Sequence, residues 1–517
     1  MRFRLQLITI SDEGSERIHP VAELARGCEL RPETTGLTLA EGKQMLKQVQ
    51  QVVVDEQVQT CMAQHRQCAI CGELLSPKGH HQIKLQTVFG KLQIRSPRLR
   101  RCPCSKGEGT KSFSPLARVW PERSTPERLY LETLFASLVS YGTATKLLAE
   151  LLPLEEQLNA MTIRNHLFAV AKRSEAELGT EQVSFIEGCP RDWAKMPIPN
   201  GPLTVGIDGG FVRAQRGEGW FEVIAGKSVL EFRRGDAGES KSSKCFGFVQ
   251  TYDDRPKRRL FELLKSQGMQ ENQQVVFLSD GGEDVRNLQV YLNPQAEHLL
   301  DWFHITMRLT MLRQQALGVN ANEILETIER IKHYLWHGNV FQALQHIEFL
   351  QMDLDCIEDR TAKLEKLEQG VADFLAYIQN NRGYIPDYGE RHRHNETIST
   401  GFVESTVNQV VSKRFVKKQQ MQWTPRGAHL LLQTRTKVLN GDLEQTFRSL
   451  YCKDNKPDPA DHSSKRTFQR TKEFEREIRR FFTHSEVERL KKLKAPVQVT
   501  PNVGLENRSR APLKELF

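Results

Sequence analysis

Three acidic side chains occur where a metal-dependent phosphoryl-transfer site would need them. Asp208 directly follows the apolar run 203–207, Asp280 follows the run 275–278 and one serine, and Glu404 lies further along the chain. Cleavage of a phosphodiester commonly uses two divalent ions about 3.5–4 Å apart. Mg²⁺ takes oxygen ligands, so carboxylates at the ends of strands and helices suit such a site. We therefore predict that these three residues hold two Mg²⁺ (or Mn²⁺) ions.

Each of these carboxylates has an alternative. A lone aspartate after a strand is more often a turn or capping residue, but both aspartates precede Gly-Gly, which lets a substrate approach closely. Glu404 beside a basic run then favours a functional interpretation. Glu283 and Asp284 are rivals to Asp280, although they lie past the strand end, where we expect them to cap a helix. Glu396 is the rival to Glu404, in a polar loop that would fix its side chain less well.

Four of the ten cysteines have the spacing of a structural zinc site, Cys-x2-Cys followed by Cys-x-Cys: Cys68, Cys71, Cys102 and Cys104. We predict that they bind one Zn²⁺. The short second pair leaves room for a substitute ligand from a nearby set, namely Cys61, His65, His80 and His81. Free thiols in a small β module are the alternative.

A run of basic residues follows Glu404. We interpret it as a set of side chains that bind DNA phosphates near the scissile bond. Its members are Lys413, Arg414, Lys417 and Lys418, with Arg426 beyond them. A solvated face is the more common meaning of such a run. Trp423 either stacks on an unpaired base or is a buried anchor, which is the more common role.

Composition limits the class of protein. The chain has 517 residues, a formal charge of +9 and a pI near 9.0, which favours several domains and a polyanionic partner. The sequence contains no apolar run of membrane-spanning length, and its start lacks the pattern of a secretory signal. We expect a cytoplasmic protein, where thiols stay reduced and a cysteine cluster favours metal over disulfides.

Two expected modules precede the carboxylates. Residues 1–64 are expected to be a helical region, because apolar residues recur at helical spacing between 46 and 58. Residues 65–120 are expected to form a zinc-ribbon-like module, with a β-hairpin at 83–94.

A helix-turn-helix region is expected at 121–180. Thr125 can cap a first helix, Gly142 is expected to break it, and a third helix begins near Thr162. The outward face of this third helix carries the residues expected to bind DNA, Arg164 and Asn165. A packing role for that helix, with its polar face solvated, is the alternative.

We expect a β-sheet to position these carboxylates. Residues 200–304 alternate as strand, strand, strand, helix, strand, helix, strand, which is the order of an RNase H-like core. Residues 305–395 have a helical pattern typical of an insertion, and 396–455 return as the C-terminal helices of the core. Residues 456–517 are basic and poor in aliphatic side chains, so we expect a flexible tail. The fold class expected is multidomain α+β.

Several motifs resemble the DDE transposases of bacterial insertion sequences, those of the ISKra type, which are related to Mutator-like transposases. The motifs are Gly-Ile-Asp-Gly-Gly-Phe-Val (206–212), Leu-Ser-Asp-Gly-Gly-Glu (278–283), Asp-Trp-Phe-His (301–304), Gly-Phe-Val-Glu-Ser-Thr-Val-Asn (401–408), Thr-Val-Phe-Gly-Lys (87–91) and Pro-Glu-Arg-Ser-Thr-Pro-Glu (121–127). The resemblance covers about residues 35 to 440. It implies that Asp208, Asp280 and Glu404 hold the metals and that Asp301 and His304 are accessory. A helix cap and a core histidine are the alternative for that pair.

We therefore expect an enzyme that binds the terminal inverted repeats of its own insertion sequence, called the element below. It would cleave the ends by metal-dependent hydrolysis and join the 3′-hydroxyl to target DNA. Its partners would be double-stranded DNA and further copies of the chain, as a homodimer or larger homo-oligomer. Two alternatives stay open, a domesticated DNA-binding protein without catalysis and an RNase H-like nuclease without strand joining.

Overall fold

The computed structural model describes residues 1–451 except for 12, 30, 105–111, 121, 155–157, 183–184, 186–189, 200, 216–218, 231–242, 283–287, 289–295, 319–321, 358–359 and 417–420. Four residues considered above, Glu283, Asp284, Lys417 and Lys418, lie outside the described residues, as does the tail 456–517. Within the described part, no helix is both long and apolar enough to cross a membrane.

The N-terminal region begins with a β-hairpin, so the prediction of a helical region over 1–64 is wrong for its first part. Strand β1 (Arg2–Ile10) pairs antiparallel with β2 (Glu16–Ala25). A short 3-10 turn, η1 (Pro32–Thr34), precedes the long helix α1 (Leu39–Gln64). The alternation of apolar and polar residues in β1 is the period of a strand and was the available signal.

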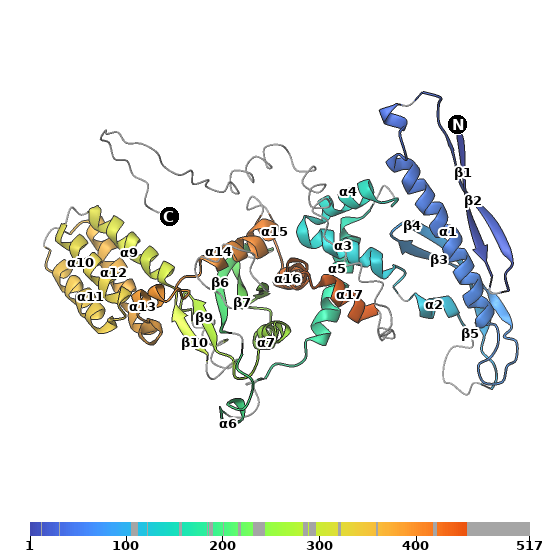
Figure 1. Ribbon diagram of the computed structural model, residues 1–517. Coiled ribbons are helices and arrows are strands. Elements are labelled where there is room, and N and C mark those ends of the chain that lie inside the picture. Colours follow the sequence, from blue (N-terminus) through green and yellow to red (C-terminus); the bar gives the residue numbers. More distant parts are fainter. Residues whose placement is uncertain are drawn as a thin grey trace. The chain divides into compact units, whose positions relative to one another are not determined.

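The second module is a three-stranded antiparallel sheet (Figure 1). The predicted hairpin is confirmed and is longer than expected, with β3 (Pro77–Thr87) paired to β4 (Gly90–Arg100). Strand β5 (Ser112–Phe113) and helix α2 (Pro115–Val119) complete it. Its core consists of buried aliphatic residues from both strands and from α1 and α2: Val54, Ile83, Leu85, Leu92, Ile94 and Leu116.

Three helices follow, as predicted: α3 (Pro126–Leu138), α4 (Tyr141–Leu151) and α5 (Ala160–Glu177). Thr125 is the N-cap residue of α3. The predicted break at Gly142 is wrong, because Gly142 lies within α4 and the hydroxyl of Ser140 accepts a hydrogen bond from Thr143 N–H instead. A short helix α6 (Pro190–Trp193) leads to the central sheet.

The central sheet has five strands in the order β10-β9-β6-β7-β8. Strand β7 is antiparallel to its neighbours β6 and β8, whereas β9 and β10 run parallel to β6. The strands are β6 (Leu203–Arg213), β7 (Trp220–Leu230), β8 (Ser243–Val249), β9 (Val275–Ser279) and β10 (Glu297–Leu300), with helix α7 (Pro256–Ser266) between β8 and β9. Side chains on alternate positions fill a core on each face, one of them shared with α7.

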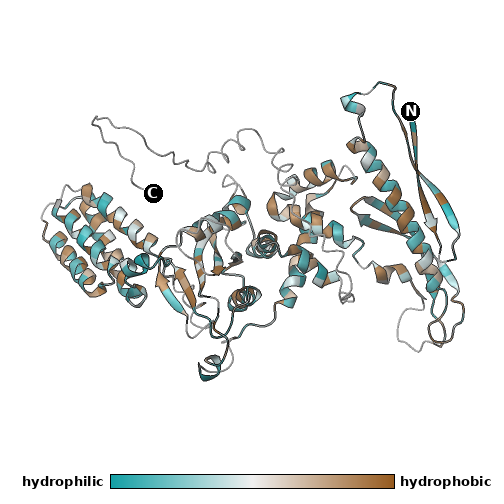
Figure 2. Cartoon of the chain, viewed as in Figure 1, coloured by the Kyte–Doolittle hydropathy of each residue, from teal (hydrophilic) through white to brown (hydrophobic). Residues whose placement is uncertain are grey.

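The region after β10 is helical, as predicted for the insertion. It contains α9 (Trp302–Leu317), α10 (Asn322–Trp336), α11 (Val340–Asp355), α12 (Ala362–Asn381), the 3-10 turn η2 (Arg382–Tyr384) and α13 (Tyr388–Arg393). Apolar and polar residues alternate along these helices (Figure 2), and their apolar sides form one core of their own.

The chain then returns to the central sheet through a nearly continuous helical stretch. Its parts are α14 (Gly401–Val407), the π-helical turn η3 (Asn408–Ser412) and α15 (Lys413–Phe415), followed by α16 (Pro425–Asn440) and α17 (Leu443–Tyr451). Thr424 caps the start of α16, and Gly441 ends the helix in a left-handed conformation.

Glycines in β6 allow α14 to lie directly on the strand. A Cβ atom added at Gly206 would stand 2.1 Å from Val403 Cγ2, and one at Gly210 would stand 3.1 Å from Val407 Cγ1. Both valines lie on the side of α14 that faces the strand, and Val403 is fully buried. The missing side chains of the strand therefore make room for the helix that carries Glu404.

We expect Gly206→Ala to destabilise the protein by about 1–3 kcal/mol, because the added methyl group overpacks the contact with Val403. Denaturant unfolding would measure the loss. Gly142→Ala is the matched control, because a Cβ there meets nothing within 4 Å and alanine favours the helix. A Gly206→Ala protein as stable as the unaltered chain would contradict the packing argument.

Candidate active site and metal centre

Asp208 lies within β6, and Asp280 directly follows the neighbouring parallel strand β9. Gly206 of β6 is paired with Leu278 of β9, so two residues further on Asp208 lies level with Asp280. Asp280 directly follows its strand, as predicted. Asp208 does not end its strand, because β6 continues to Arg213 and Asp208 pairs with Ala225 of β7. An extended backbone on both sides holds the Asp208 side chain on the face that α14 covers.

Glu404 reaches the same face from α14. It lies next to Val403, which packs on Gly206, and its own side chain is exposed. Burial raises the pKa of Asp208 most strongly; the Gly209 N–H and the charge of His304 oppose this, while the charges of Asp280 and Glu404 add to it. The charges of Asp280 and Glu404 therefore both act on Asp208, and a divalent cation would relieve this repulsion.

The rival glutamate has a different environment. Glu396 accepts a hydrogen bond from Arg391 at 2.9 Å, and the same guanidinium also pairs with Glu297. Arg391, which also pairs with Glu297 at the start of β10, already neutralises the Glu396 carboxylate. The preference for Glu404 stays a prediction, and it agrees with the action of the Glu404 charge on Asp208.

Asp301 is fully buried at the junction of β10 and α9. It caps α9 by accepting the Phe303 N–H at 2.8 Å, and its other oxygen accepts the hydroxyl of Thr400, directly before α14. His304 Nε2 lies 3.7 Å from that oxygen, and the charge of His304 acts on Asp208. The capping role is confirmed, and the position next to the carboxylates agrees with an accessory role as well.

The turn that carries Asp280 rests against the helical insertion. Tyr377 of α12 donates its hydroxyl to the Asp280 carbonyl at 3.0 Å, and Gly282 N–H donates to the Asp280 carboxylate at 3.1 Å. Gly281 has a φ of +88°, and a Cβ there would stand 2.5 Å from Asn381 Oδ1. Only glycine fits this turn, so the insertion helps to position Asp280.

The prediction that Arg414 contacts DNA is wrong. Its side chain is buried, with Nε and Nη2 both 3.1 Å from the Ala136 carbonyl. Arg435 donates to the neighbouring carbonyl of Ser137, so two guanidinium groups meet the C-terminal turn of α3, where carbonyls lack helical partners. Burial lowers the pKa of Arg414 to about 10, which leaves it charged at neutral pH.

Trp423 is the buried anchor and not an exposed stacking platform. It is 8% exposed, and its Nε1 donates to the Phe415 carbonyl at 3.1 Å. The Arg414 guanidinium lies 5.2 Å from its ring, a cation–π contact. Of the remaining basic residues, Lys413 and Arg426 are exposed. The spacing Val407, Val410 or Val411, Arg414 follows one helical face and was the signal for the burial of Arg414.

The third helix of the helix-turn-helix region presents a mixed surface. Four residues on the inward face of α5 are buried, namely Ile163, Leu167, Val170 and Ala171. Asn165 is exposed, whereas Arg164 is partly buried, with Nη1 3.0 Å from Met161 Sδ and its guanidinium 4.8 Å from the Phe168 ring. Thr162 lines a small cleft against β3 and β4. Asn165 is thus the more accessible of the two proposed base-contacting residues.

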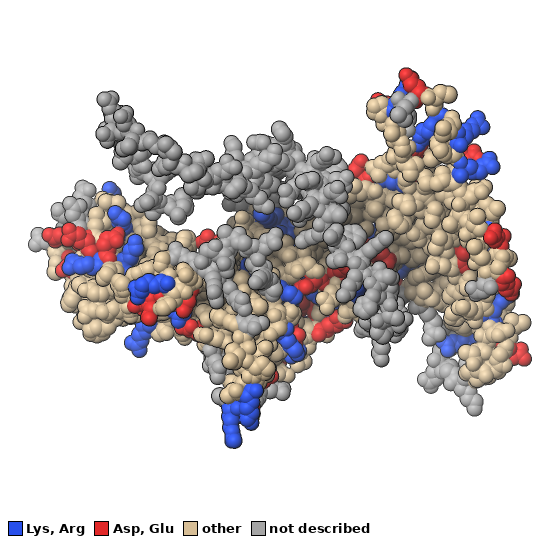
Figure 3. All heavy atoms as spheres, viewed as in Figure 1, with Lys and Arg blue, Asp and Glu red and all other residues tan. Residues whose placement is uncertain are grey.

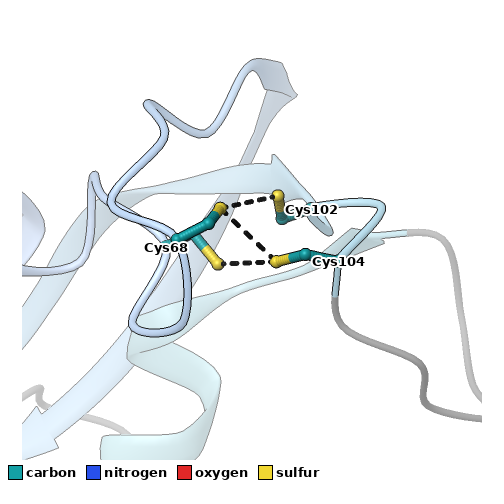
Figure 4. Close-up of side chains that lie close together, drawn as sticks. Cys68, Cys102 and Cys104 are labelled. Atoms are coloured by element: carbon teal, nitrogen blue, oxygen red, sulfur yellow. Dashed lines mark hydrogen bonds between the residues drawn. The ribbon is translucent and has the colours of Figure 1, made fainter.

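Four cysteines form a cluster that could hold a metal ion. The Sγ atoms of Cys68, Cys71, Cys102 and Cys104 lie within 4.8 Å of one another, with separations of 3.4–3.5 Å across the three closest pairs. Figure 4 shows the sulfur atoms turned toward a common centre. Zinc–sulfur bonds of about 2.3 Å in a tetrahedron place sulfurs about 3.8 Å apart, close to this arrangement.

The loop around the first cysteine pair is built for such a cluster. The Cys68 carbonyl accepts the Gly72 N–H at 2.9 Å, which folds the chain back over the Cys68 sulfur. Backbone N–H groups of Cys71 and Ile70 stabilise the thiolate and lower the pKa of Cys68 to about 6, whereas the neighbouring sulfurs raise the pKa of Cys104. A thiolate is the form that binds a metal.

A second group, Glu175, Asp253 and His429, also has its ligand atoms within 4.8 Å. Arg259 already lies among them. Its guanidinium contacts Glu175 at 2.8 and 2.9 Å and Asp253 at 2.8 and 3.1 Å. A divalent ion would meet this buried positive charge, so we interpret the group as an ion-pair network. It joins α5 to α7 and α16, and Arg255 adds a further contact to Glu175 at 3.2 Å.

Charge on the face drawn in Figure 3 is mixed over the helical insertion, where acidic and basic side chains intermingle. On that face, the basic side chains over the insertion do not form one continuous patch, although the whole chain carries a net charge of +9. Comparison of the sequence with protein-family models gave no match, and neither did comparison with curated proteins.

The ion-pair network predicts an acid-sensitive contribution to stability. Burial opposes ionisation of Glu175, but hydrogen bonds from His429 and Arg259 outweigh it and hold its pKa at about 2. Because this pKa is below the unfolded value of about 4.3, the contribution is complete above that value and is lost as the pH falls toward 2. The difference in Tm between the unaltered protein and Glu175→Gln should therefore shrink over this range.

Thermal unfolding of both proteins at successive pH values would measure that difference. Glu177→Gln, in an exposed position on the same helix, is the control. A Tm difference for Glu175→Gln that stays constant as the pH falls would show that Glu175 does not titrate as this network requires.

Proposed function

We propose that the chain is a DNA transposase that cleaves the ends of its element and joins them to target DNA. The observation that carries the proposal is the meeting of three carboxylates from separate segments, Asp208 in β6, Asp280 after β9 and Glu404 on α14. The order of the described elements along the chain, β6, β7, β8, α7, β9 and β10, agrees with the order expected for an RNase H-like core, and this supports the same proposal. The motif resemblance described above adds to it.

Asp208, Asp280 and Glu404 would hold two Mg²⁺ or Mn²⁺ ions, which when bound activate the attacking oxygen and stabilise the leaving oxygen. The chain itself supplies rigid positions for these ligands. Pairing with β7 fixes the backbone of Asp208, Tyr377 holds the backbone of Asp280, and the contact of α14 with Gly206 fixes the helix of Glu404. Asp301 orients His304 beside Asp208. No covalent protein–DNA intermediate is required.

The other modules would bind DNA and assemble the complex. Asn165 and Arg164 on α5 are proposed to contact the terminal repeats, and Lys413 and Arg426 to contact phosphates. The cysteine cluster is proposed to hold one structural Zn²⁺, because four sulfur ligands leave no open position for chemistry. An element has two ends, so a homodimer or larger homo-oligomer is proposed to act on them.

Substituting the carboxylates tests the proposal. Asp208→Asn, Asp280→Asn and Glu404→Gln should each lower cleavage of DNA flanking the chain's own gene by more than about a hundredfold, because each removes the charge of a metal ligand. DNA binding should persist in all three. Gel assays with Mg²⁺ and a supercoiled target would measure cleavage and strand transfer separately.

Glu396→Gln is the matched control for Glu404→Gln, because this carboxylate is paired with Arg391. Near-normal cleavage by any one of the three variants would remove that residue from the site. Cleavage by the unaltered chain without strand transfer would favour a nuclease, and DNA binding without cleavage would favour a regulatory protein.

The zinc assignment predicts about one Zn²⁺ per chain and its loss in Cys71→Ser. The module that contains β3 and β4 has a small core, so we expect it to become sensitive to proteases without the metal, while the central sheet stays folded. Elemental analysis and limited proteolysis would measure both effects. Cys356→Ser, an exposed cysteine outside the cluster, should retain the zinc. Purified protein that lacks zinc yet has a folded module would refute the assignment.

A further inference from the structure

Arg308 of α9 is an exposed arginine in contact with an aromatic ring. Its guanidinium carbon lies 4.1 Å from the centroid of the Tyr377 ring, which belongs to α12, and the side chain also forms a hydrogen bond with the Tyr377 hydroxyl. These contacts hold the guanidinium in place, and since a guanidinium has five N–H donors, others remain to donate outward. The insertion thus presents a positive charge in a defined position. Helix α9 carries Arg308, and helix α12 carries the ring that supports it.

This cation lies next to the proposed metal ligands. Tyr377, under Arg308, donates its hydroxyl to the Asp280 carbonyl at 3.0 Å. The charges of Arg308, Asp280 and Asp301 all act on that hydroxyl. His304 precedes Arg308 by four residues on α9, so the two share a face of the helix, and the charge of His304 acts on Asp208.

Arg308 nevertheless has no carboxylate within ion-pair distance among the residues that the structure describes. Arg313, further along the same helix, pairs with Glu329 at 3.6 Å. Within the described part of the chain, Arg308 therefore keeps N–H donors that no carboxylate occupies and that an anion from outside the chain could accept.

We propose that Arg308 binds a backbone phosphate of the DNA beside the scissile bond, which rests on the function proposed above. A guanidinium suits this partner because its parallel N–H donors match two phosphate oxygens. The carboxylates cannot bind phosphate oxygens directly, whereas Arg308 supplies positive charge at their edge. The helical insertion would then contribute a substrate-binding residue and not only support for Asp280.

The first test measures binding of a labelled random-sequence duplex in Ca²⁺, which does not support cleavage, as the salt concentration is varied. Arg308→Ala should weaken binding by about tenfold and reduce the slope of log affinity against log salt by about 0.9, the value for one phosphate contact. Arg313→Ala is the matched control, because its charge is already paired.

Tyr377 variants separate the ring from the hydroxyl. Tyr377→Leu removes the support of the guanidinium and should reduce the salt slope as Arg308→Ala does. Tyr377→Phe keeps the ring, so it should leave the salt slope unchanged even if it slows cleavage through Asp280. A merely structural role of Arg308 would give the two tyrosine variants the same salt slope.

The second test uses duplexes from the DNA flanking the chain's gene, each with one neutral methylphosphonate. At one position beside the cleavage site, the substitution should weaken binding by the unaltered protein and by Arg313→Ala, but not by Arg308→Ala, which has already lost that contact. Failure of the unaltered chain to bind any DNA would overturn both the inference and the proposed function. Equal behaviour of Arg308→Ala and Arg313→Ala would overturn the inference alone, whereas loss of cleavage in the carboxylate variants would still support the function.

Discussion

The close contact between α14 and β6 at Gly206 is the constraint on which the arrangement of the carboxylates depends. Nearly two hundred residues separate Gly206 from Val403, and the two meet only because the strand has no side chain at that position. Interiors pack at high density, so even one methyl group there must displace the helix or the strand. Since Glu404 follows Val403, any such displacement would also move a proposed metal ligand. The same backbone atoms of β6 therefore allow the packing of α14 and determine the position of Glu404.

Buried arginines hold the three-helix region to the central sheet by two different means. Arg259 is paired with carboxylates from its own segment and from α5, so its charge is neutralised by opposite charge. Arg414 and Arg435 have carbonyl partners instead, from the last turn of α3. Buried ion pairs often contribute little net stability, because desolvation offsets attraction, but they are costly to break. Such contacts therefore favour one defined placement of α3 and α5 over alternative packings.

The sequence was sufficient for most of the elements because apolar periodicity and end signals are local. The strands of the central sheet, the helical insertion and the limits of α16 follow from them. Errors arose where a distant segment decided the outcome or where a neighbouring capping residue was overlooked. Arg414 belonged to a basic run, yet its guanidinium is bonded to a carbonyl of α3. Ser140 rather than Gly142 marks the start of α4. For the site, residue types and the apolar runs before them indicated the aspartates, and the polar loop around Glu396 favoured Glu404, a preference that stays a prediction.

The two ends of the helical insertion meet at the central sheet. Trp302 N–H donates to the Ile398 carbonyl at 3.1 Å, and Asp301 accepts the hydroxyl of Thr400. Closing a loop in this way has an entropic cost that rises only slowly with the length of the loop, by about 0.6 kcal/mol for each doubling. Evolution can therefore lengthen, shorten or exchange the distal helices α10 and α11 while the carboxylates keep their positions. Selection can therefore adjust the length of the insertion separately from the chemistry of the three carboxylates.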